Sequence, residues 1–300
     1  MNMYQKKEER KNKPEEQNGR KTNINWFPGH MTKAKREMQE KLKLVDMVIE
    51  LRDARIPVAS TNPLLAELTM SKPRLIILSK RDKANNEITK AWIKTLESEF
   101  IKVIALDLLK DNIQPIIMEE ARHLMKNMIE RQIKRGIKPR AIRSMVVGIP
   151  NVGKSTFINR MAKRKALEAA DRPGVTKNLR WVKVDSDLEL LDTPGVLWPK
   201  FDDPTIALHL AITGAIRDSI LPLEEVAYGA MKILLRDYPN LIKERFKVDL
   251  VEDPYQMICM IGEKRGFKLK DNEIDEKRTI EMFLREIRSE KIGAISWEKP

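Results

Sequence analysis

Residues 148–155 read Gly-Ile-Pro-Asn-Val-Gly-Lys-Ser and fit G-x-x-x-x-G-K-[ST], a pattern that binds the phosphates of nucleoside triphosphates. Its two glycines let backbone N–H groups approach phosphate oxygens, Lys154 can reach the β- and γ-phosphates, and the Ser155 hydroxyl can coordinate Mg²⁺. The apolar run 145–147 precedes the loop and a helical pattern follows it, which favours a nucleotide site over a glycine-rich turn that binds nothing. The expected phosphate contacts are Asn151, Val152, Gly153, Lys154, Ser155 and Thr156.

A second polar stretch, Ser79-Lys80-Arg81-Asp82, follows another apolar run and is close to N-K-x-D, the sequence by which GTPases recognise guanine. Asp82 can accept hydrogen bonds from both guanine N–H donors, and the stem of Lys80 can pack across the base. Adenine lacks this donor pair, so a buried Asp82 would favour GTP over ATP. The loop 107–112 stands where a GTPase touches the guanine edge, although it lacks the usual Ser-Ala pair.

Two further stretches have the chemistry of nucleotide-dependent switches. Thr176 follows a Pro-Gly pair in an otherwise polar segment, and a threonine there can close on Mg²⁺ and the γ-phosphate. Residues 192–195 match D-x-x-G, in which Asp192 can hold Mg²⁺ through water and the Gly195 N–H can contact the γ-phosphate. We therefore expect Ser155, Thr176 and Asp192 to form a Mg²⁺ site.

The flanking residues predict the elements that position these motifs. Short apolar runs end directly at the polar stretches, which is typical of buried strands in a parallel sheet. Stretches with a helical pattern of apolar residues lie between several of these runs. The expected strands cover residues 47–51, 74–78, 102–106, 145–147, 179–184 and 188–191, and the expected helices cover about 32–43, 87–98 and 156–161. From residue 203 onward the pattern is helical, with periodic stretches at 223–235, 255–261 and 280–287.

The order of the motifs is rotated relative to an ordinary GTPase, in which the phosphate loop comes first and the guanine-recognition motif last. Here residues 79–82 precede the phosphate loop, and Thr176 and residues 192–195 follow it. The simplest explanation is a circular permutation, which surface termini tolerate. The cut falls after the D-x-x-G motif, so this switch leads directly into the helical part. We therefore expect hydrolysis to reposition the helical part.

We therefore predict an α/β fold: a circularly permuted P-loop GTPase domain over residues 24–202, followed by a small all-helical domain over 203–292. Residues 1–23 contain seven basic and four acidic residues and few apolar ones, which predicts a disordered basic tail. Residues 293–300 are expected to form a terminal tail.

The composition favours a polyanionic partner and a reducing compartment. The chain has 57 Lys and Arg against 44 Asp and Glu, a formal net charge of +13, and Cys259 is its only cysteine. No apolar run approaches the roughly 18 residues of a membrane span, and no signal-peptide core or transit-peptide composition is evident at the N-terminus. We expect a cytoplasmic protein without a membrane partner.

The positive charge is unevenly distributed along the chain. Residues 121–143 contain eight Lys or Arg and one acidic residue, whereas residues 203–300 contain 16 basic and 18 acidic residues. The basic stretch is either a solvated helix face or a nucleic-acid contact, and the sequence leaves both interpretations open.

The chain resembles the circularly permuted GTPases of the ribosome biogenesis GTPase A family over roughly residues 24–290. The matching segments are residues 25–31 (Asn-Trp-Phe-Pro-Gly-His-Met), 51–57 (Leu-Arg-Asp-Ala-Arg-Ile-Pro), 148–155, 174–176 and 192–196. The resemblance implies GTP hydrolysis, assembly of the large ribosomal subunit, a helical domain that binds ribosomal RNA, and a monomer away from the ribosome. Ser79 replaces the family's asparagine, which implies a lower affinity for guanine.

Catalysis is expected to need a group from outside the usual motifs. Val196 stands where many GTPases have the glutamine that orients the attacking water, and an apolar side chain cannot do this, so the intrinsic rate should be low. The resemblance implies His30 as the source of that group, against the alternative of a structural loop histidine. With His30, we expect Lys154 and Thr176 to be catalytic.

Asn151 resembles the residue that binds K⁺ in monovalent-cation-dependent GTPases. A cation there would offset charge that develops between the β- and γ-phosphates. A loop-capping asparagine is the alternative.

Three functional classes are consistent with these motifs. The first is a GTP-hydrolysing assembly factor that binds immature large subunits with GTP and leaves after hydrolysis. The second is a nucleotide-dependent adaptor for a non-ribosomal RNA or protein. The third, an RNA-binding protein with a degenerate nucleotide site, is disfavoured by the intact Lys154, Ser155, Thr176 and Asp192.

Overall fold

The computed structural model of the chain describes residue 36 and residues 38–163, 180–193 and 203–300. Its strands are β1 (Met47–Asp53), β2 (Arg74–Ser79), β3 (Ile101–Ala105), β4 (Ile142–Gly148), β5 (Arg180–Lys183) and β6 (Leu188–Asp192). They form one sheet in the order β3-β2-β1-β4-β6-β5, parallel except for β5, which runs antiparallel to β6. The expected α/β class is confirmed.

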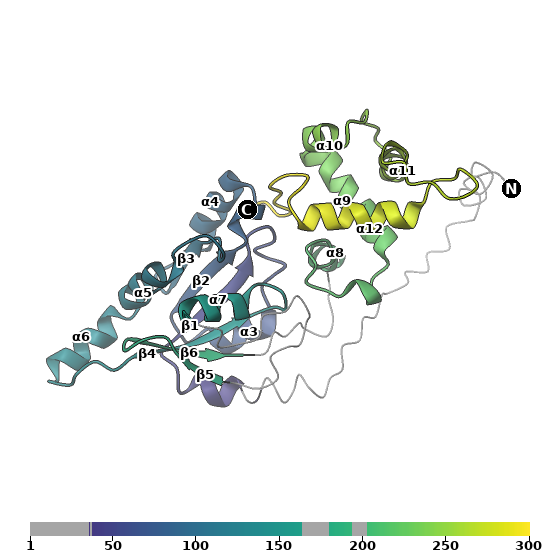
Figure 1. Cartoon of the computed structure of the whole chain (residues 1–300). Helices are drawn as coiled ribbons and strands as arrows, with labels where there is room; N and C mark the ends of the chain where they lie inside the picture. Colours follow the sequence, from purple (N-terminus) through teal and green to yellow (C-terminus); the bar gives the residue numbers. More distant parts are fainter. Residues whose placement is uncertain (1–35, 37, 164–179, 194–202) are drawn as a thin grey trace.

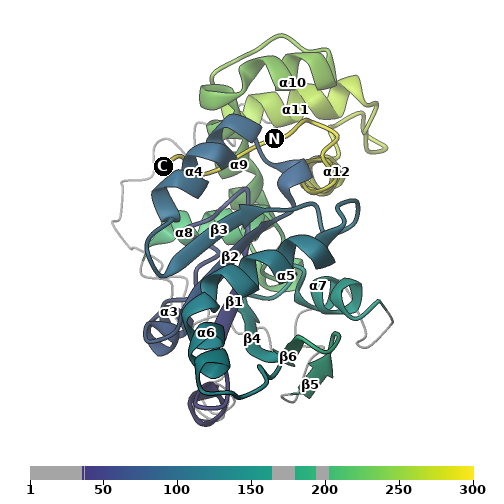
Figure 2. The same ribbon diagram turned by 90° about the vertical axis from the view of Figure 1, so that its left-hand side faces the viewer.

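Helices cover both faces of this sheet (Figures 1 and 2). The helices of this part are α3 (Pro63–Thr69), α4 (Asn86–Leu96), α5 (Ile113–Leu124), α6 (Lys126–Lys134) and α7 (Lys154–Met161), with a short 3₁₀ helix, η1 (Arg81–Lys83). Leu75 and Ile77 of β2 pack in the core that includes α5 and α7, whereas Ile76 and Leu78 pack with Trp92 of α4. The alternation of side chains along the strand explains this division.

The arrangement of the strands accounts for the rotated motif order. β4, which leads into the phosphate loop, lies in the middle of the sheet between β1 and β6. The guanine-recognition half (β1, β2 and β3) and the switch half (β5 and β6) therefore lie on opposite sides of β4. Because β1 pairs directly with β4, a domain cut after β6 still closes into one continuous sheet.

The second part of the chain is a cluster of helices beside the sheet (Figure 1). Its helices are α8 (Pro204–Ile212), η2 (Asp218–Ile220), α9 (Leu223–Asp237), α10 (Pro239–Phe246), α11 (Pro254–Lys264) and α12 (Glu276–Arg288). α9 contacts α8, α10, α11 and α12 and is therefore the centre of the cluster. Asp203 and Asp253 cap α8 and α11 ahead of a proline at the first helical position, a favourable helix start.

Residues 292–299, which we name the C-terminal strap, connect the two parts. The backbone N–H groups of Ile295 and Trp297 donate to the carbonyls of Lys83 and Arg55 at 2.9 and 2.8 Å. The Glu298 carboxylate accepts from the N–H groups of Val58 and Ala59 at 2.6 and 2.8 Å. Within residues 293–300, which we expected to form a terminal tail, Ile295, Ser296 and Trp297 are buried.

Some expectations lie outside the described residues, among them the basic tail over residues 1–23. Among the described residues, no helix is both long and apolar enough to cross a membrane.

Candidate nucleotide site

The carboxyl ends of four parallel strands bring the predicted motifs to one edge of the sheet. The strand register pairs Asp53 of β1 with Ser79 of β2, and Val146 of β4 with Asp192 of β6. Gly148, the first residue of the phosphate loop, pairs with Leu51. Ligands of open α/β sheets bind at this edge, so the topology supports a single site built from motifs far apart in the sequence.

The phosphate loop depends on its two glycines for its shape. Gly148 has φ +151°, and a Cβ atom there would lie 2.6 Å from the carbonyl oxygen of Leu51. Gly153 has φ +103° and is the residue before α7. Asn151 has φ +58°, a left-handed conformation that asparagine tolerates better than most residues. The loop therefore turns tightly between β4 and the N-terminus of α7.

Lys154 lies folded back inside its own loop. Its Nζ donates to the carbonyl oxygens of Gly148 and Ile149, both at 3.0 Å. Burial lowers the pKa of Lys154 to about 8, and the nearby charge of Asp192 opposes this shift. In a nucleotide complex, phosphate oxygens would replace these two carbonyls as the acceptors of Lys154.

The described part of the predicted Mg²⁺ site consists of oxygen donors. Asp192 is fully buried at the end of β6, and Ser155 lies in the first turn of α7, after the loop on the neighbouring strand. A carboxylate and a hydroxyl are hard ligands of the kind that Mg²⁺ prefers. The Thr193 hydroxyl donates to the Val146 carbonyl at 2.7 Å and fixes the end of β6 against β4.

Ser79 connects the guanine-recognition motif to the phosphate loop. Its hydroxyl is completely buried and lies 2.9 Å from the carbonyl oxygen of Arg52 and 2.7 Å from that of Val152. The one hydroxyl hydrogen of Ser79 is shared between these two carbonyl oxygens. Although Ser79 replaces the expected asparagine, a side-chain contact to the phosphate loop is present.

Lys80 and Asp82 of this motif lie in different environments. Lys80 has φ +56°, and its Nζ pairs with Asp53 at 3.0 Å. Asp82 lies in η1, and its pKa is raised by partial burial and by the charges of Asp107 and Glu290. Guanine N–H donors would favour the ionised carboxylate, so a bound base would lower the pKa of Asp82 again.

The buried pair Asp53 and Arg55 contacts Lys80 of the guanine-recognition motif. The sequence placed both residues in the segment 51–57 that resembles the family but gave them no role in the site. Arg55 donates through Nε and Nη2 to the two Asp53 oxygens at 2.9 and 2.7 Å. Burial would raise the pKa of Asp53, but Arg55 and Lys80 hold it well below its usual range. The signal in the sequence was the charged stretch directly after the β1 run, at the edge where ligands bind.

Asn151 contacts the helical part of the chain. Its Nδ2 donates to the carbonyl oxygen of Gly214, just after α8, at 3.0 Å. The loop residue proposed as a K⁺ ligand is therefore also a contact between the two parts.

Four residues assigned from the sequence, His30, Thr176, Gly195 and Val196, lie outside the described residues. The structure therefore brings together Ser79, Lys80, Asp82, residues 151–156 and Asp192, and leaves those four assignments as predictions.

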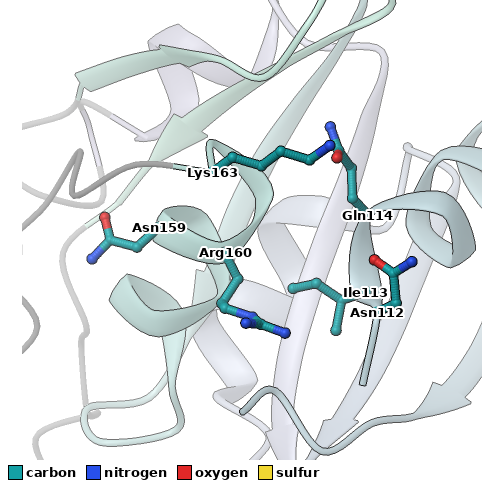
Figure 3. Close-up of a pocket in the computed structure, with 6 residues that line it drawn as sticks. All are labelled: Asn112, Ile113, Gln114, Asn159, Arg160 and Lys163. Atoms are coloured by element: carbon teal, nitrogen blue, oxygen red, sulfur yellow. The ribbon is translucent and has the colours of Figure 1, made fainter. Parts of the chain in front are cut away.

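A separate cavity of about 390 Å³ lies where α5 begins and α7 ends (Figure 3). It is lined by Asn112, Ile113, Gln114, Asn159, Arg160 and Lys163. Asn112 ends the loop 107–112 that we expected at the guanine edge, but none of the six residues belongs to the phosphate loop or to residues 79–82. We therefore assign the nucleotide to the strand edge rather than to this cavity.

A central phosphate loop, a guanine-recognition motif from the preceding half of the chain and a switch aspartate from the following half define a circularly permuted P-loop GTPase. Comparisons with known proteins agree with this class. The family described as "50S ribosome-binding GTPase" matches residues 143–284. A Bacillus licheniformis protein named ribosome biogenesis GTPase A is 48% identical over 280 residues, covering 92% of this chain and 98% of its own.

The Bacillus pumilus protein of the same name is 45% identical over 278 residues, covering 92% of this chain and 99% of its own. The structure of GNP-bound YlqF from T. maritima has a similar fold, with a TM-score of 0.60, 24% identity and coverage of 89% and 98% of the two chains. The chain belongs to the ribosome biogenesis GTPase A family, and it is a GTPase with a role in ribosome assembly. GTPase domains of this kind use Mg²⁺, which the oxygen donors Ser155 and Asp192 fit.

Proposed function

We propose that this protein assists assembly of the large ribosomal subunit, binding immature particles in its GTP form and leaving them after hydrolysis. The names of the relatives and the description of the matching family support a ribosomal partner. The observation that supports release after hydrolysis is the 3.0 Å contact between Asn151 of the phosphate loop and Gly214 of the helical domain. A change at the phosphates can reach the helical domain through this contact.

The domain organisation is part of this proposal. The GTPase domain over residues 24–202 binds and hydrolyses GTP, and the helical domain over 203–292 contacts ribosomal RNA. The C-terminal strap keeps the helical domain beside the guanine-recognition motif, since it bonds to the backbone of Lys83.

The catalytic residues in this proposal are Lys154, Thr176 and His30. Lys154 binds the β- and γ-phosphates, and its positive charge offsets charge that develops during transfer. Ser155, Thr176 and Asp192 would hold Mg²⁺, whose charge would supply further stabilisation. His30 positions the attacking water in place of the glutamine that Val196 replaces, and Asn151 coordinates K⁺ beside the phosphates.

The test is GTP hydrolysis by the purified chain in KCl, with and without purified large ribosomal subunits, and with small subunits as the control. We expect stimulation by large subunits alone. GTP binding without stimulation by mature or immature large subunits would contradict the proposal and favour a non-ribosomal adaptor.

The same assay separates the two catalytic assignments. His30→Ala should spare GTP binding and abolish stimulated turnover, and unchanged stimulated turnover would exclude a role for His30. Replacing KCl with NaCl should slow turnover if Asn151 binds K⁺, whereas equal rates would remove that assignment.

A further inference from the structure

The C-terminal end of α8 is contacted by side chains from three distant elements. We name residues 211–214 the α8 turn. Its carbonyl oxygens accept from Arg288 Nη2 at Ala211 (2.9 Å), Arg288 Nε at Ile212 (3.0 Å), Arg55 Nη2 at Thr213 (3.3 Å) and Asn151 Nδ2 at Gly214 (3.0 Å). Carbonyls at the end of a helix lack the regular donors four residues further on, so these side-chain contacts help to fix the position of the turn. Two of the three side chains come from the nucleotide site.

Arg55 is shared between the α8 turn and the guanine-recognition motif. Asp53 holds Arg55 through a two-bond fork and also holds Lys80 at 3.0 Å, so one carboxylate orients both cations. Asp53 and Arg55 are 2% and 3% exposed. A buried forked pair of this kind has little freedom to reorient. Arg55 Nη2 and Lys80 Nζ both donate to Asp53 Oδ2, so a change at Lys80 can reach Arg55 through this shared oxygen.

Asn151 provides the second connection, from the phosphate side. Its Nδ2 is engaged by Gly214, so Oδ1 is the amide atom left to accept a hydrogen bond or to coordinate a cation. If the α8 turn moves, the orientation of this amide is lost. The helical domain therefore contributes to the geometry of the phosphate loop without touching a phosphate.

We propose that Arg55 is a positioning residue that links guanine-nucleotide binding to docking of the helical domain. The α8 turn is the element that Arg55 and Asn151 of the nucleotide site both contact. Linkage requires the effect to be reciprocal: nucleotide should stabilise the docked turn, and an undocked turn should weaken nucleotide binding. The proposal concerns the free chain with GDP, so it can fail or hold independently of the ribosomal role.

The test compares Arg55→Lys with the wild type for GDP affinity and for hydrogen exchange in residues 211–216. Lysine keeps the charge beside Asp53 but cannot form the fork and reach Thr213 together. We expect GDP affinity to fall by about fivefold or more, the lower range of typical coupling. We also expect GDP to slow exchange in the α8 turn of the wild type and to lose this effect in the variant. A residue with a structural role alone would change exchange equally with and without GDP.

Arg245→Lys is the matched control, because Arg245 forms a comparable fork with Glu286 inside the helical domain at 2.8 and 2.7 Å. It should leave both the GDP affinity and the GDP-dependent exchange unchanged.

A second variant perturbs the α8 turn from the side of the helical domain, and it tests the proposal if Arg55→Lys does not fold. Gly214 has φ +79°, and an added Cβ would lie 3.3 Å from Arg288 Nε, so Gly214→Ala should displace the turn. Gly266→Ala is its control, with φ +68° and nothing within 4 Å of the added atom. We expect Gly214→Ala, but not Gly266→Ala, to weaken GDP binding. Wild-type GDP affinity in Gly214→Ala, or equal GDP-dependent exchange in all four variants, would overturn the proposal.

Discussion

At the scale of single residues, Ser79 shows how a short side chain can contact the phosphate loop from a position where an asparagine was expected. Its hydroxyl reaches the carbonyls of Arg52 and Val152 from the end of β2, because the strand register brings the phosphate loop within 3 Å. An asparagine would span a longer gap to the same loop. The serine therefore joins the guanine-recognition motif to the phosphate loop at the level of the backbone.

Ser79→Ala should destabilise the chain and weaken GDP binding. It removes the donor to two carbonyls at a fully buried position, and a lost partner at such a site costs about 1–3 kcal/mol. Urea denaturation measures the loss. Ser186→Ala, at an exposed serine, is the control and should cost less than about 0.5 kcal/mol. Equal costs for the two variants would show that the buried hydroxyl contributes nothing.

Lys154 predicts a pH dependence of nucleotide binding. Its pKa is about 8 in the free chain, and phosphate oxygens favour the protonated form, so GDP binding above pH 8 should take up a proton and weaken as pH rises. The same folded pKa lies below the ordinary lysine pKa of 10.5, so the free chain should become more stable as pH increases from about 8 to 10.5 and the unfolded chain loses this proton.

Calorimetry of GDP binding at pH 9 in two buffers of different ionisation enthalpy measures the proton uptake. The same titration at pH 7, where the free lysine is already charged, is the control. Identical apparent enthalpies at pH 9 in the two buffers would contradict the lowered pKa.

At the scale of elements, the periodic helices and the strands could be predicted, and the elements without a periodic pattern could not. β1, β2 and β4 follow the apolar runs, and α9, α11 and α12 contain the apolar positions at helical spacing. α8 gave no such signal, because apart from Thr205 and His209 its residues are apolar and leave no polar face, and its last four residues, His209 to Ile212, are all buried.

The candidate site divides in a similar way. Motifs with fixed local spacing revealed Lys154, Ser155, Asp192 and the guanine-recognition motif. The partners of those residues could not be read from the sequence, because Arg55 and Thr213 are 158 positions apart and only the completed fold brings them together.

The C-terminal strap leads to a prediction about stability. Trp297 is 5% exposed, and its segment bonds to the backbone of the GTPase domain, so Trp297→Ala should cost about 3–5 kcal/mol of unfolding free energy. Trp181→Ala is the control: this tryptophan is 38% exposed on β5, with Arg143 over its ring, and should cost about 1 kcal/mol. Urea denaturation compares the two. Similar costs would mean that the strap only rests on the surface.

At the scale of the whole molecule, the positive charge gathers on one projection of the GTPase domain. We name residues 131–138 the basic arm; it includes the end of α6, which lies at the far end of the molecule from the helical domain (Figure 1). Arg131, Lys134, Arg135 and Lys138 are exposed. Within the described residues, no ion pair involves these four, whereas Arg122 and Arg140 nearby pair with Asp187 and Asp46. Their charge is therefore available to a polyanion.

The basic arm should contribute to binding of ribosomal particles through RNA phosphates. Replacing its four cations with glutamine should lower affinity and flatten the dependence of binding on salt, by about 0.7–0.9 units of log–log slope for each lost phosphate contact. Sedimentation across a salt series measures this slope, and unchanged GDP affinity confirms that the domain is intact. The same change at Lys264, Lys268, Lys270 and Lys277, exposed cations of the helical domain, measures that domain's share. Equal slopes for the arm variant and the wild type would show that the arm is only a solvated face, because counterion release follows the number of phosphates neutralised and not the net charge of the chain.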